Sequence, residues 1–237
     1  MFSKLKRVKI LIGRFKNKKH LLNIFTLFSF LKIYLELKKN LNHLLKNEIH
    51  EYFDKSDYKN LNNSKYLDLD VWVFENLNRT FKLNLHNKTG LKILDISTGF
   101  GYFPYICNHF GHSAEGTDLK NSENNLYEKV TNKLKVKIQN VKINKYEELK
   151  LKQSYDIITS FMICFNAHRT KEVWHIKEWK FFFNQINKYL NDKGLLYLSF
   201  NAETIDEPID KNLLEYFSSI GGLIDGTNIQ FQKKSLS

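Results

Sequence analysis

Residues 91–119, LKILDISTGFGYFPYICNHFGHSAEGTDL, place two carboxylates and two closely spaced glycines where they could hold a ligand. An apolar run ends at Asp95, and a loop containing Gly99 and Gly101 follows. Glycine has no side chain, so such a loop can turn tightly and its backbone can approach a ligand. Asp118 ends a second short run, and an aspartate there can accept hydrogen bonds from both hydroxyls of a ribose. The stretch therefore predicts a site for an adenosine-containing cofactor.

The spacing of the loop residues separates two classes of cofactor. A dinucleotide fingerprint needs the pattern G-x-G-x-x-G or G-x-G-x-x-A. When its first two glycines are set on Gly99 and Gly101, the third position is Pro104, which does not give the close helix–strand packing of that glycine. Counted from Asp95, the loop reads D-x-S-x-G-x-G. This pattern resembles the first motif of class I S-adenosylmethionine-dependent methyltransferases, with Ser97 in place of the first glycine.

The resemblance covers residues 91–200 and includes more than one motif. Asp118 after the second strand, Tyr155-Asp156 at the start of the fourth and the Gly194 turn before the fifth have family-like spacing. The stretch SFMICFNAH is also similar to a group of uncharacterised bacterial methyltransferases. The resemblance implies S-adenosylmethionine as the cofactor. It also implies an α/β fold with a Rossmann-like, mostly parallel sheet and helices on both faces.

The resemblance further implies roles for individual residues. The loop of residues 95–101 would cradle the methionine part of the cofactor, and Asp118 would bind the ribose hydroxyls. Asn144 or Lys145 would lie near the adenine, and residues 160–162 would line the floor where the methyl group leaves. The cofactor-binding residues implied in this way are Asp95, Ser97, Thr98, Gly99, Gly101, Tyr102, Asp118, Leu119, Asn144, Lys145 and Phe161.

Residues that could act on the acceptor follow the fourth strand, in CFNAHRTKEVWH. A hydroxyl acceptor usually needs a general base, whereas an amine need not have one. The candidates are His168, the first choice because it is close behind the strand end, and then Asn166 and His175. The alternatives are a solvent-bound loop histidine at His168 and a helix-start residue at His175. Cys164 is predicted to be a core residue, and no metal is expected because these side chains lack a recognised ligand spacing.

The elements that must position these residues alternate from residue 91 between short apolar runs and amphipathic helical patterns. This alternation is typical of a parallel α/β sheet. Strands are expected at 91–96, 112–117, about 136–143, 155–161 and 195–200, followed by two short strands ending at 229–231. Helices are expected at about 102–110, about 123–134, 174–190 and 211–219.

The N-terminal segment carries most of the charge. Residues 1–50 hold 12 Lys/Arg and 2 Asp/Glu, whereas residues 51–237 hold 25 and 23. Residues 21–37 have a narrow polar stripe opposite a wide apolar face of a helix. The polar positions are Asn23, Thr26, Ser29, Lys32 and Glu36. The segment is short and charged for a membrane span. Two interpretations stay open: a helix packed on the main domain or on a second copy, and a basic amphipathic helix on an anionic membrane surface.

The expected organisation has three parts. A basic helical leader covers residues 1–50, a helical pre-domain segment covers 51–90, and the S-adenosylmethionine-binding Rossmann-like domain covers 91–237. Two further helices are predicted before residue 91, the first marked by five apolar residues. These are Leu41, Leu44, Leu45, Ile49 and Phe53, and the second helix is predicted at Asp70–Leu77.

The leading functional hypothesis is S-adenosylmethionine-dependent methyl transfer, by in-line displacement, to a small molecule or to a glycan or lipid-linked acceptor. The alternatives are a non-catalytic Rossmann-like nucleoside-binding or scaffold protein and an NAD(P)-dependent oxidoreductase. A nucleic-acid partner is not expected, because +10 of the net charge of +12 lies in the leader. Two cysteines inside apolar runs favour a reducing, cytoplasmic location, with membrane-surface association as the alternative.

Overall fold

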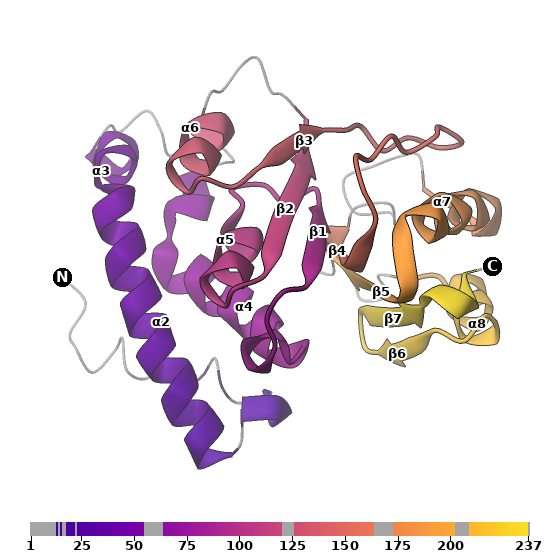
Figure 1. Cartoon of the computed structure of the whole chain (residues 1–237), viewed down its shortest axis with the longest axis horizontal. Helices are drawn as coiled ribbons and strands as arrows, with labels where there is room; N and C mark the ends of the chain where they lie inside the picture. Colours follow the sequence, from indigo (N-terminus) through magenta and orange to yellow (C-terminus); the bar gives the residue numbers. More distant parts are fainter. Residues whose placement is uncertain are drawn as a thin grey trace. The chain divides into compact units, whose positions relative to one another are not determined.

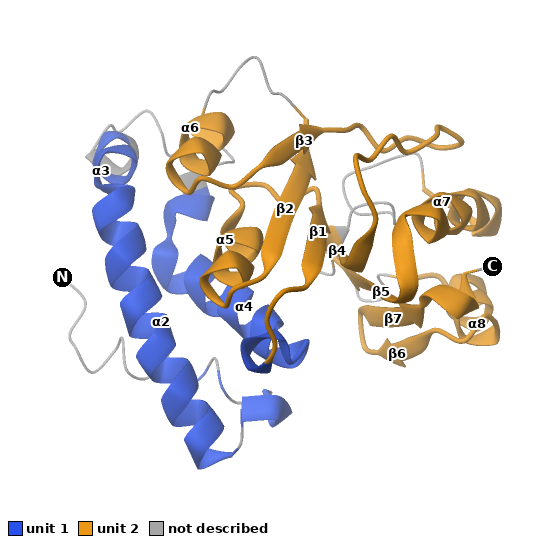
Figure 2. Cartoon of the chain, viewed as in Figure 1, with its two compact units in different colours: residues 1–87 blue, residues 88–237 orange. Residues whose placement is uncertain are grey.

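The computed structural model divides the chain into two compact units, residues 1–87 and 88–237 (Figure 2). Unit 1 contains the leader and nearly all of the predicted pre-domain segment, and unit 2 contains the predicted cofactor domain. The residues that the structure describes are 13, 15, 18–21, 23–54, 64–119, 126–163, 173–201 and 209–236.

The described part of unit 1 is helical. Its helices are α2 (Ile24–Leu44), α3 (Lys46–Asp54) and α4 (Leu69–Lys82), with 3-10 turns η1 (Lys19–Leu21), η3 (Ser64–Leu67) and η4 (Leu85–Asn87). The side chain of Asn23 starts α2 by accepting hydrogen bonds from the N–H groups of Phe25 and Thr26. Asp68 caps α4 in the same way. The N-terminal helical segment that the sequence predicts is therefore present.

Helix α2 packs on α4 through aromatic rings. Phe30 meets Phe74 edge-on at a centroid distance of 5.1 Å and Phe81 at 5.2 Å. The hydroxyl of Tyr34 donates to Asp70 Oδ1 at 2.9 Å. Edge-to-face ring pairs add to the free energy gained from apolar burial, so these contacts fix the side of α2 that faces the core of unit 1.

The prediction of one helix running from Leu41 to Phe53 is wrong. Leu41 and Leu44 belong to the end of α2, the chain changes direction at Leu45, and α3 starts at the next residue. Leu41 continues the buried stripe of α2 toward α4. The apolar spacing that suggested one helix is therefore shared between the last turn of α2 and the following helix α3.

Unit 2 is built on one seven-stranded sheet with the order β3-β2-β1-β4-β5-β7-β6 (Figure 1). The pairs from β3 to β5 are parallel, and β7 is antiparallel to β5 and β6. The strands are β1 (Lys92–Ile96), β2 (Ser113–Asp118), β3 (Ile138–Asn140), β4 (Tyr155–Ile163), β5 (Leu190–Phe200), β6 (Leu223–Asp225) and β7 (Asn228–Gln232). The helices are α5 (Tyr102–His109), α6 (Leu126–Lys133), α7 (Ile176–Tyr189) and α8 (Lys211–Ser219), with a 3-10 turn η5 (Lys233–Ser235).

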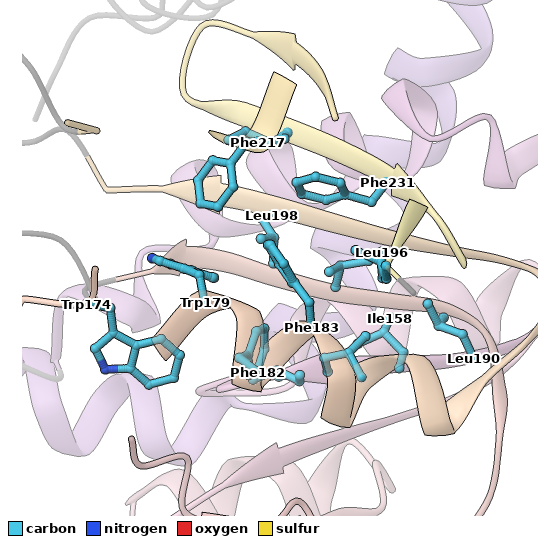
Figure 3. Packing of buried hydrophobic residues seen from close by; sticks show 14 of the residues in the cluster. Ile158, Trp174, Trp179, Phe182, Phe183, Leu190, Leu196, Leu198, Phe217 and Phe231 are labelled. Carbon is cyan, nitrogen blue, oxygen red and sulfur yellow. The ribbon is translucent and has the colours of Figure 1, made fainter. Parts of the chain in front are cut away.

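The two faces of the sheet are covered by different helices. On one face, Ile158 and Leu198 belong to the same buried cluster as Trp179 and Phe183 of α7 and Phe217 of α8 (Figure 3). On the other face, α5 packs on β4 through its Phe103 side chain, whose ring lies 4.9 Å from that of Phe161. Because adjacent strand residues point to opposite faces, this arrangement confirms the predicted α/β fold with helices on both faces.

β3 and β5 differ most in length from the prediction. β3 has three residues and is an edge strand that pairs only with β2. β5 begins at Leu190, which pairs with Tyr155, before a shift in register brings Leu195 opposite Ile157. The predicted turn before this strand therefore lies within β5, as an irregularity of the ladder.

Candidate functional site

The loop after β1 makes a sharp turn before α5. Ser97, Gly99 and Gly101 all have positive φ angles, of 57°, 60° and 75°. This left-handed region is open to glycine and costs other residues about 1–2 kcal/mol. Ser97 therefore adopts the backbone conformation for which the family motif uses its first glycine. The replacement of this glycine by Ser97 therefore preserves the turn but adds local backbone strain.

The loop is tied to β1 and β4 through Asp95. This carboxylate is buried, and its Oδ2 accepts the Thr98 hydroxyl at 2.7 Å while its Oδ1 accepts the Thr159 hydroxyl, also at 2.7 Å. Hydrogen bonds to an ionised group are stronger than those between neutral groups. Asp95 therefore holds the loop in place through Thr98 and connects it to β4 through Thr159. The direct contact between Asp95 and the cofactor, which the resemblance implies, stays a prediction.

The neighbouring strand β2 holds the other side of the loop. The N–H of Thr98 donates to the Thr117 carbonyl at 3.0 Å, and the N–H of Ser97 donates to the Thr117 hydroxyl at 3.2 Å. Gly116 leaves room for Thr98, since a Cβ built there would lie 2.3 Å from Thr98 Cγ2. The sequence analysis missed Gly116, Thr117 and Thr159. The only available signal was a glycine inside a predicted strand, which often marks a close approach of backbone.

Asp118 ends β2 and joins the loop to a cavity. Its Oδ2 accepts the N–H of Gly99 at 2.7 Å, and its Oδ1 accepts the N–H of Leu119 at 2.8 Å. These three residues line a cavity of about 160 Å³ together with side chains of α6 and β3, among them Tyr127 and Asn140. A carboxylate offers about four acceptor positions. Asp118 can therefore accept two further hydroxyl donors, as a ribose would present.

The surroundings of Asp118 affect its ionisation in two opposing ways. Burial raises the pKa of its carboxyl group above the ordinary value, and the N–H groups of Leu119 and Gly99 lower it by a smaller amount. A partly desolvated carboxylate gains more from each new donor than one in water. The residues present therefore fit a ligand with paired hydroxyl groups.

The remaining predicted cofactor residues belong to different elements of unit 2. Tyr102 is the first residue of α5 and is buried, which raises the pKa of its phenol. Asn144 and Lys145 are half-buried in the connection from β3 to β4, and Phe161 is buried in β4. The cavity brings together Gly99, Asp118 and Leu119 of the predicted set. Binding by each of these residues stays a prediction.

The end of β4 has an irregular backbone. Met162 has a φ of 60°, and the pairing with β5 shifts between Phe161 and Ile163. A bulge of this kind redirects the side chains that follow it and is frequent beside functional sites. It lies within the stretch that the resemblance assigns to the floor of the transfer site.

The candidates for a general base are only partly described. His168 and Asn166 lie outside the described residues. His175 is exposed at the start of α7, where its backbone N–H donates to Glu178 Oε2 at 2.9 Å and so closes the first turn of that helix. Tyr146, from the β3–β4 connection, also donates its hydroxyl to Glu178, at 2.5 Å. The catalytic roles of the three candidates stay predictions.

Metal clusters and membrane-spanning helices are both absent from the described residues. In that part of the chain, no three His, Cys, Asp or Glu side chains are grouped so that they could hold a metal ion. None of the helices described combines the length and the apolar character that crossing a bilayer requires.

The comparison with family models identifies the chain. It belongs to the family described as "Methyltransferase domain", whose model matches residues 37–232. The resemblance to class I S-adenosylmethionine-dependent methyltransferases is thereby confirmed, together with the enzyme class and with S-adenosylmethionine as the cofactor. No curated protein sequence matches the chain.

Solved structures with a similar arrangement include three methyltransferases. A TehB-like S-adenosylmethionine-dependent methyltransferase from Corynebacterium glutamicum has 16% identity over 63% of this chain and 82% of that chain, with a TM-score of 0.43. A ribosomal protein L11 methylase from Lactobacillus delbrueckii subsp. bulgaricus has 14% identity over 67% and 78%, with a TM-score of 0.42. The amino pentose methyltransferase CalS10 from Micromonospora echinaspora has 15% identity over 53% and 49%, with a TM-score of 0.39.

Proposed function

We propose that this methyltransferase binds S-adenosylmethionine across the carboxyl ends of β1 and β2 and transfers the methyl group in line to a small-molecule acceptor. The observation that carries the proposal is the Asp118 carboxylate, which lines the cavity while its Oδ2 accepts the N–H of Gly99. The cofactor and the transfer reaction follow from the family; the residue roles and the class of acceptor are our proposal.

Each part of the carboxyl edge has its own role in binding. Asp118 accepts the ribose hydroxyls, and the turn through Gly99 and Gly101 brings backbone close to the methionine part. The first N–H groups of α5 lie behind this turn and carry a partial positive charge that favours a carboxylate. Asn144 and Lys145, which follow β3, lie toward the adenine.

The chemistry then needs little from the protein beyond orientation. When bound, S-adenosylmethionine supplies a methyl group that the neighbouring sulfonium makes electrophilic. The residues around the end of β4 align the acceptor nucleophile and exclude water, and this alignment supplies most of the rate. His168 or His175 takes a proton where the acceptor is a hydroxyl.

A small-molecule acceptor fits the charge of the chain better than a nucleic acid does. Residues 88–237 hold 20 Lys/Arg and 17 Asp/Glu, so the unit with the site has no large excess of positive charge for binding phosphates. The segment after β4 reads Asn166-Ala167-His168, without the Asp/Asn-Pro-Pro-Tyr motif of enzymes that methylate base or glutamine nitrogens. The proposal also includes a glycan or lipid-linked precursor as the acceptor.

Titration calorimetry of the full chain with S-adenosylmethionine, S-adenosylhomocysteine and NAD⁺ tests the proposed site. We expect both sulfur nucleosides to bind and NAD⁺ not to bind. Asp118→Ala should raise their dissociation constants by roughly tenfold or more, because each lost hydrogen bond to a charged group contributes about 1.5–3 kcal/mol. Asp192→Ala is the matched control, since this carboxylate is exposed and lies on β5. If Asp118→Ala binds the two sulfur nucleosides as tightly as the wild type does, Asp118 does not bind the ribose.

The acceptor class is tested by following a radiolabelled methyl group. The enzyme is incubated with labelled cofactor and either a size-fractionated small-molecule extract, a lipid extract or purified nucleic acid. Label should enter the small-molecule or the lipid fraction. Label in the nucleic acid alone would contradict the proposed acceptor.

A further inference from the structure

Helix α2 has an apolar face that unit 1 does not cover. Its buried side carries Phe30, Tyr34, Leu37 and Leu41. A different side is exposed, and its large apolar residues are Ile24 at 73%, Phe25 at 82%, Phe28 at 73% and Leu35 at 62% exposure. Helical residues turn by about 100° each, so Ile24, Phe28 and Leu35 share one face, and Phe25 lies at its border. The wide apolar face of this helix is thus divided between a packed half and an exposed half.

Positive charge borders the exposed half. Lys32 and Lys39 are exposed and lie within about one quarter-turn of Phe28 on the helical wheel. The polar stripe that continues from Lys32 contains one acidic residue, Glu36, also exposed. Lys38 is not part of this border, since it pairs with Asp70. An apolar strip with lysines along its edge is the pattern of helices that lie in the headgroup region of a membrane.

The charge of the surrounding sequence selects among possible occupants of this face. Residues 1–50 hold 12 Lys/Arg and only 2 Asp/Glu. A second copy of the chain would bring a second, equally basic segment against the first, and the like charges would repel. Anionic lipid headgroups attract the same lysines, and acyl chains accept the exposed phenylalanines.

We propose that the exposed face of α2, defined by Ile24, Phe25, Phe28 and Leu35, binds the surface of a bilayer that contains anionic lipids. The helix lies in the plane of the interface with these four side chains among the first carbons of the acyl chains. Lys32 and Lys39, which lie between Phe28 and Phe25 on the helical wheel, reach to the phosphates. The proposal is independent of the cofactor site and of the acceptor.

The test is co-sedimentation of the full chain with vesicles of phosphatidylcholine alone or with about one-third phosphatidylserine. We expect binding to the mixed vesicles only, and loss of most of it in about 0.5 M NaCl, where the Debye length is short. Equal binding to neutral vesicles would overturn the role of the lysines. Absence of binding to both would overturn the proposal.

Two pairs of variants separate the helix face from general basicity. Phe25→Ser with Phe28→Ser should weaken vesicle binding by roughly tenfold, because the double variant lacks the two rings that bury apolar area among the acyl chains. Leu223→Ser, on β6, is the matched control, since this leucine is also largely exposed. Binding retained by the double variant would mean that the leader acts through charge alone, which overturns the proposed face.

The second pair reverses charge. Lys32→Glu with Lys39→Glu should weaken binding to anionic vesicles by roughly tenfold or more, whereas Lys150→Glu with Lys152→Glu, exposed in unit 2, should not. Thermal melting and calorimetric cofactor binding show whether each variant is folded. Sedimentation velocity of the wild type and of the phenylalanine variant completes the test. If the wild type is a dimer and the variant is a monomer, the exposed face of α2 binds a second copy of the chain and the proposal is overturned.

Discussion

The carboxyl ends of β1 and β2 are built differently from the end of β4, although the strands belong to the same sheet. At β1 and β2, polar groups hold the backbone: Asp95 accepts two threonine hydroxyls, and Asp118 accepts two N–H groups. At the end of β4, aromatic packing takes over, with the Phe161 ring 4.9 Å from Phe103 and 5.8 Å from Tyr197. Hydrogen bonds fix direction, whereas apolar contacts tolerate change of shape. This difference suits a constant cofactor on one side and a variable acceptor on the other.

The largest effect is expected at Gly116 on β2, where Thr98 packs directly against the backbone. Gly116→Ala would place a methyl group 2.3 Å from Thr98 Cγ2 and 2.8 Å from Thr98 Cβ. Overpacking of this kind costs about 1–3 kcal/mol, and it should displace the loop and weaken S-adenosylmethionine binding by roughly tenfold. Calorimetry and urea unfolding measure both effects, with Ser113→Ala on the same strand as the control. Unchanged binding would mean that the loop position does not depend on this contact.

The next effect concerns the threonine beneath the loop. Thr159→Val keeps the shape of the side chain and removes the hydroxyl that donates to Asp95. A buried acceptor that loses its donor costs about 1–3 kcal/mol, so the free energy of unfolding should fall by about that amount. Thr159→Ser retains the hydroxyl and should lose less stability. If the valine variant loses no stability, the Thr159 hydroxyl does not stabilise Asp95 and the comparison between the two strand ends is weakened.

A smaller effect is expected from pH. The pKa of Asp118 is raised in the folded state, mainly by burial. Just above the ordinary aspartate pKa, the folded protein therefore binds a proton that the unfolded chain has lost. Stability should fall as pH rises through this window, and the fall should be absent in Asp118→Asn. The measurement is urea unfolding of both proteins between about pH 4 and pH 6. The same slope in both would mean that another group titrates.

The smallest effects compare the two strained residues. Ser97→Gly and Met162→Gly each remove a side chain from a left-handed backbone, and each should raise stability by up to about 1 kcal/mol. We expect Ser97→Gly to leave methyl transfer unchanged and Met162→Gly to alter it, because Met162 lies in the stretch that we propose to line the acceptor site. Thermal melting and single-turnover rates provide the test. Altered transfer in the Ser97 variant alone would reverse the comparison.

Much of the cofactor side could be predicted from the sequence because its signals are local. Asp95, the glycine turn and Asp118 fall within one β-α-β stretch, and their spacing indicates the cofactor. Gly116 could not be assigned a role in advance, since the pattern of β2 does not reveal that Thr98 lies over it. The order of the last two strands was also not predicted, because apolar runs of a few residues do not specify their neighbours.

The acceptor side could not be derived in the same way. His168 and His175 were chosen from their position after a strand, but side-chain type alone does not distinguish a base from a helix-start residue. At His175 the structure describes an N-terminal turn closed by Glu178. The nature of an acceptor depends on the shape of a pocket, which is a product of contacts between distant parts of the chain.

The position of β7 has a consequence for the timing of synthesis. β7 lies between β5 and β6 in the sheet, although it follows both in the chain. Until residues 228–232 have left the ribosome, one side of β5 has no partner strand, and its N–H and C=O groups on that side are unpaired. The edge is closed only when Ile229 and Phe231 emerge and pair with Leu198 and Leu196. An exposed strand edge can pair with another chain, so β7 protects the nascent protein against aggregation at β5.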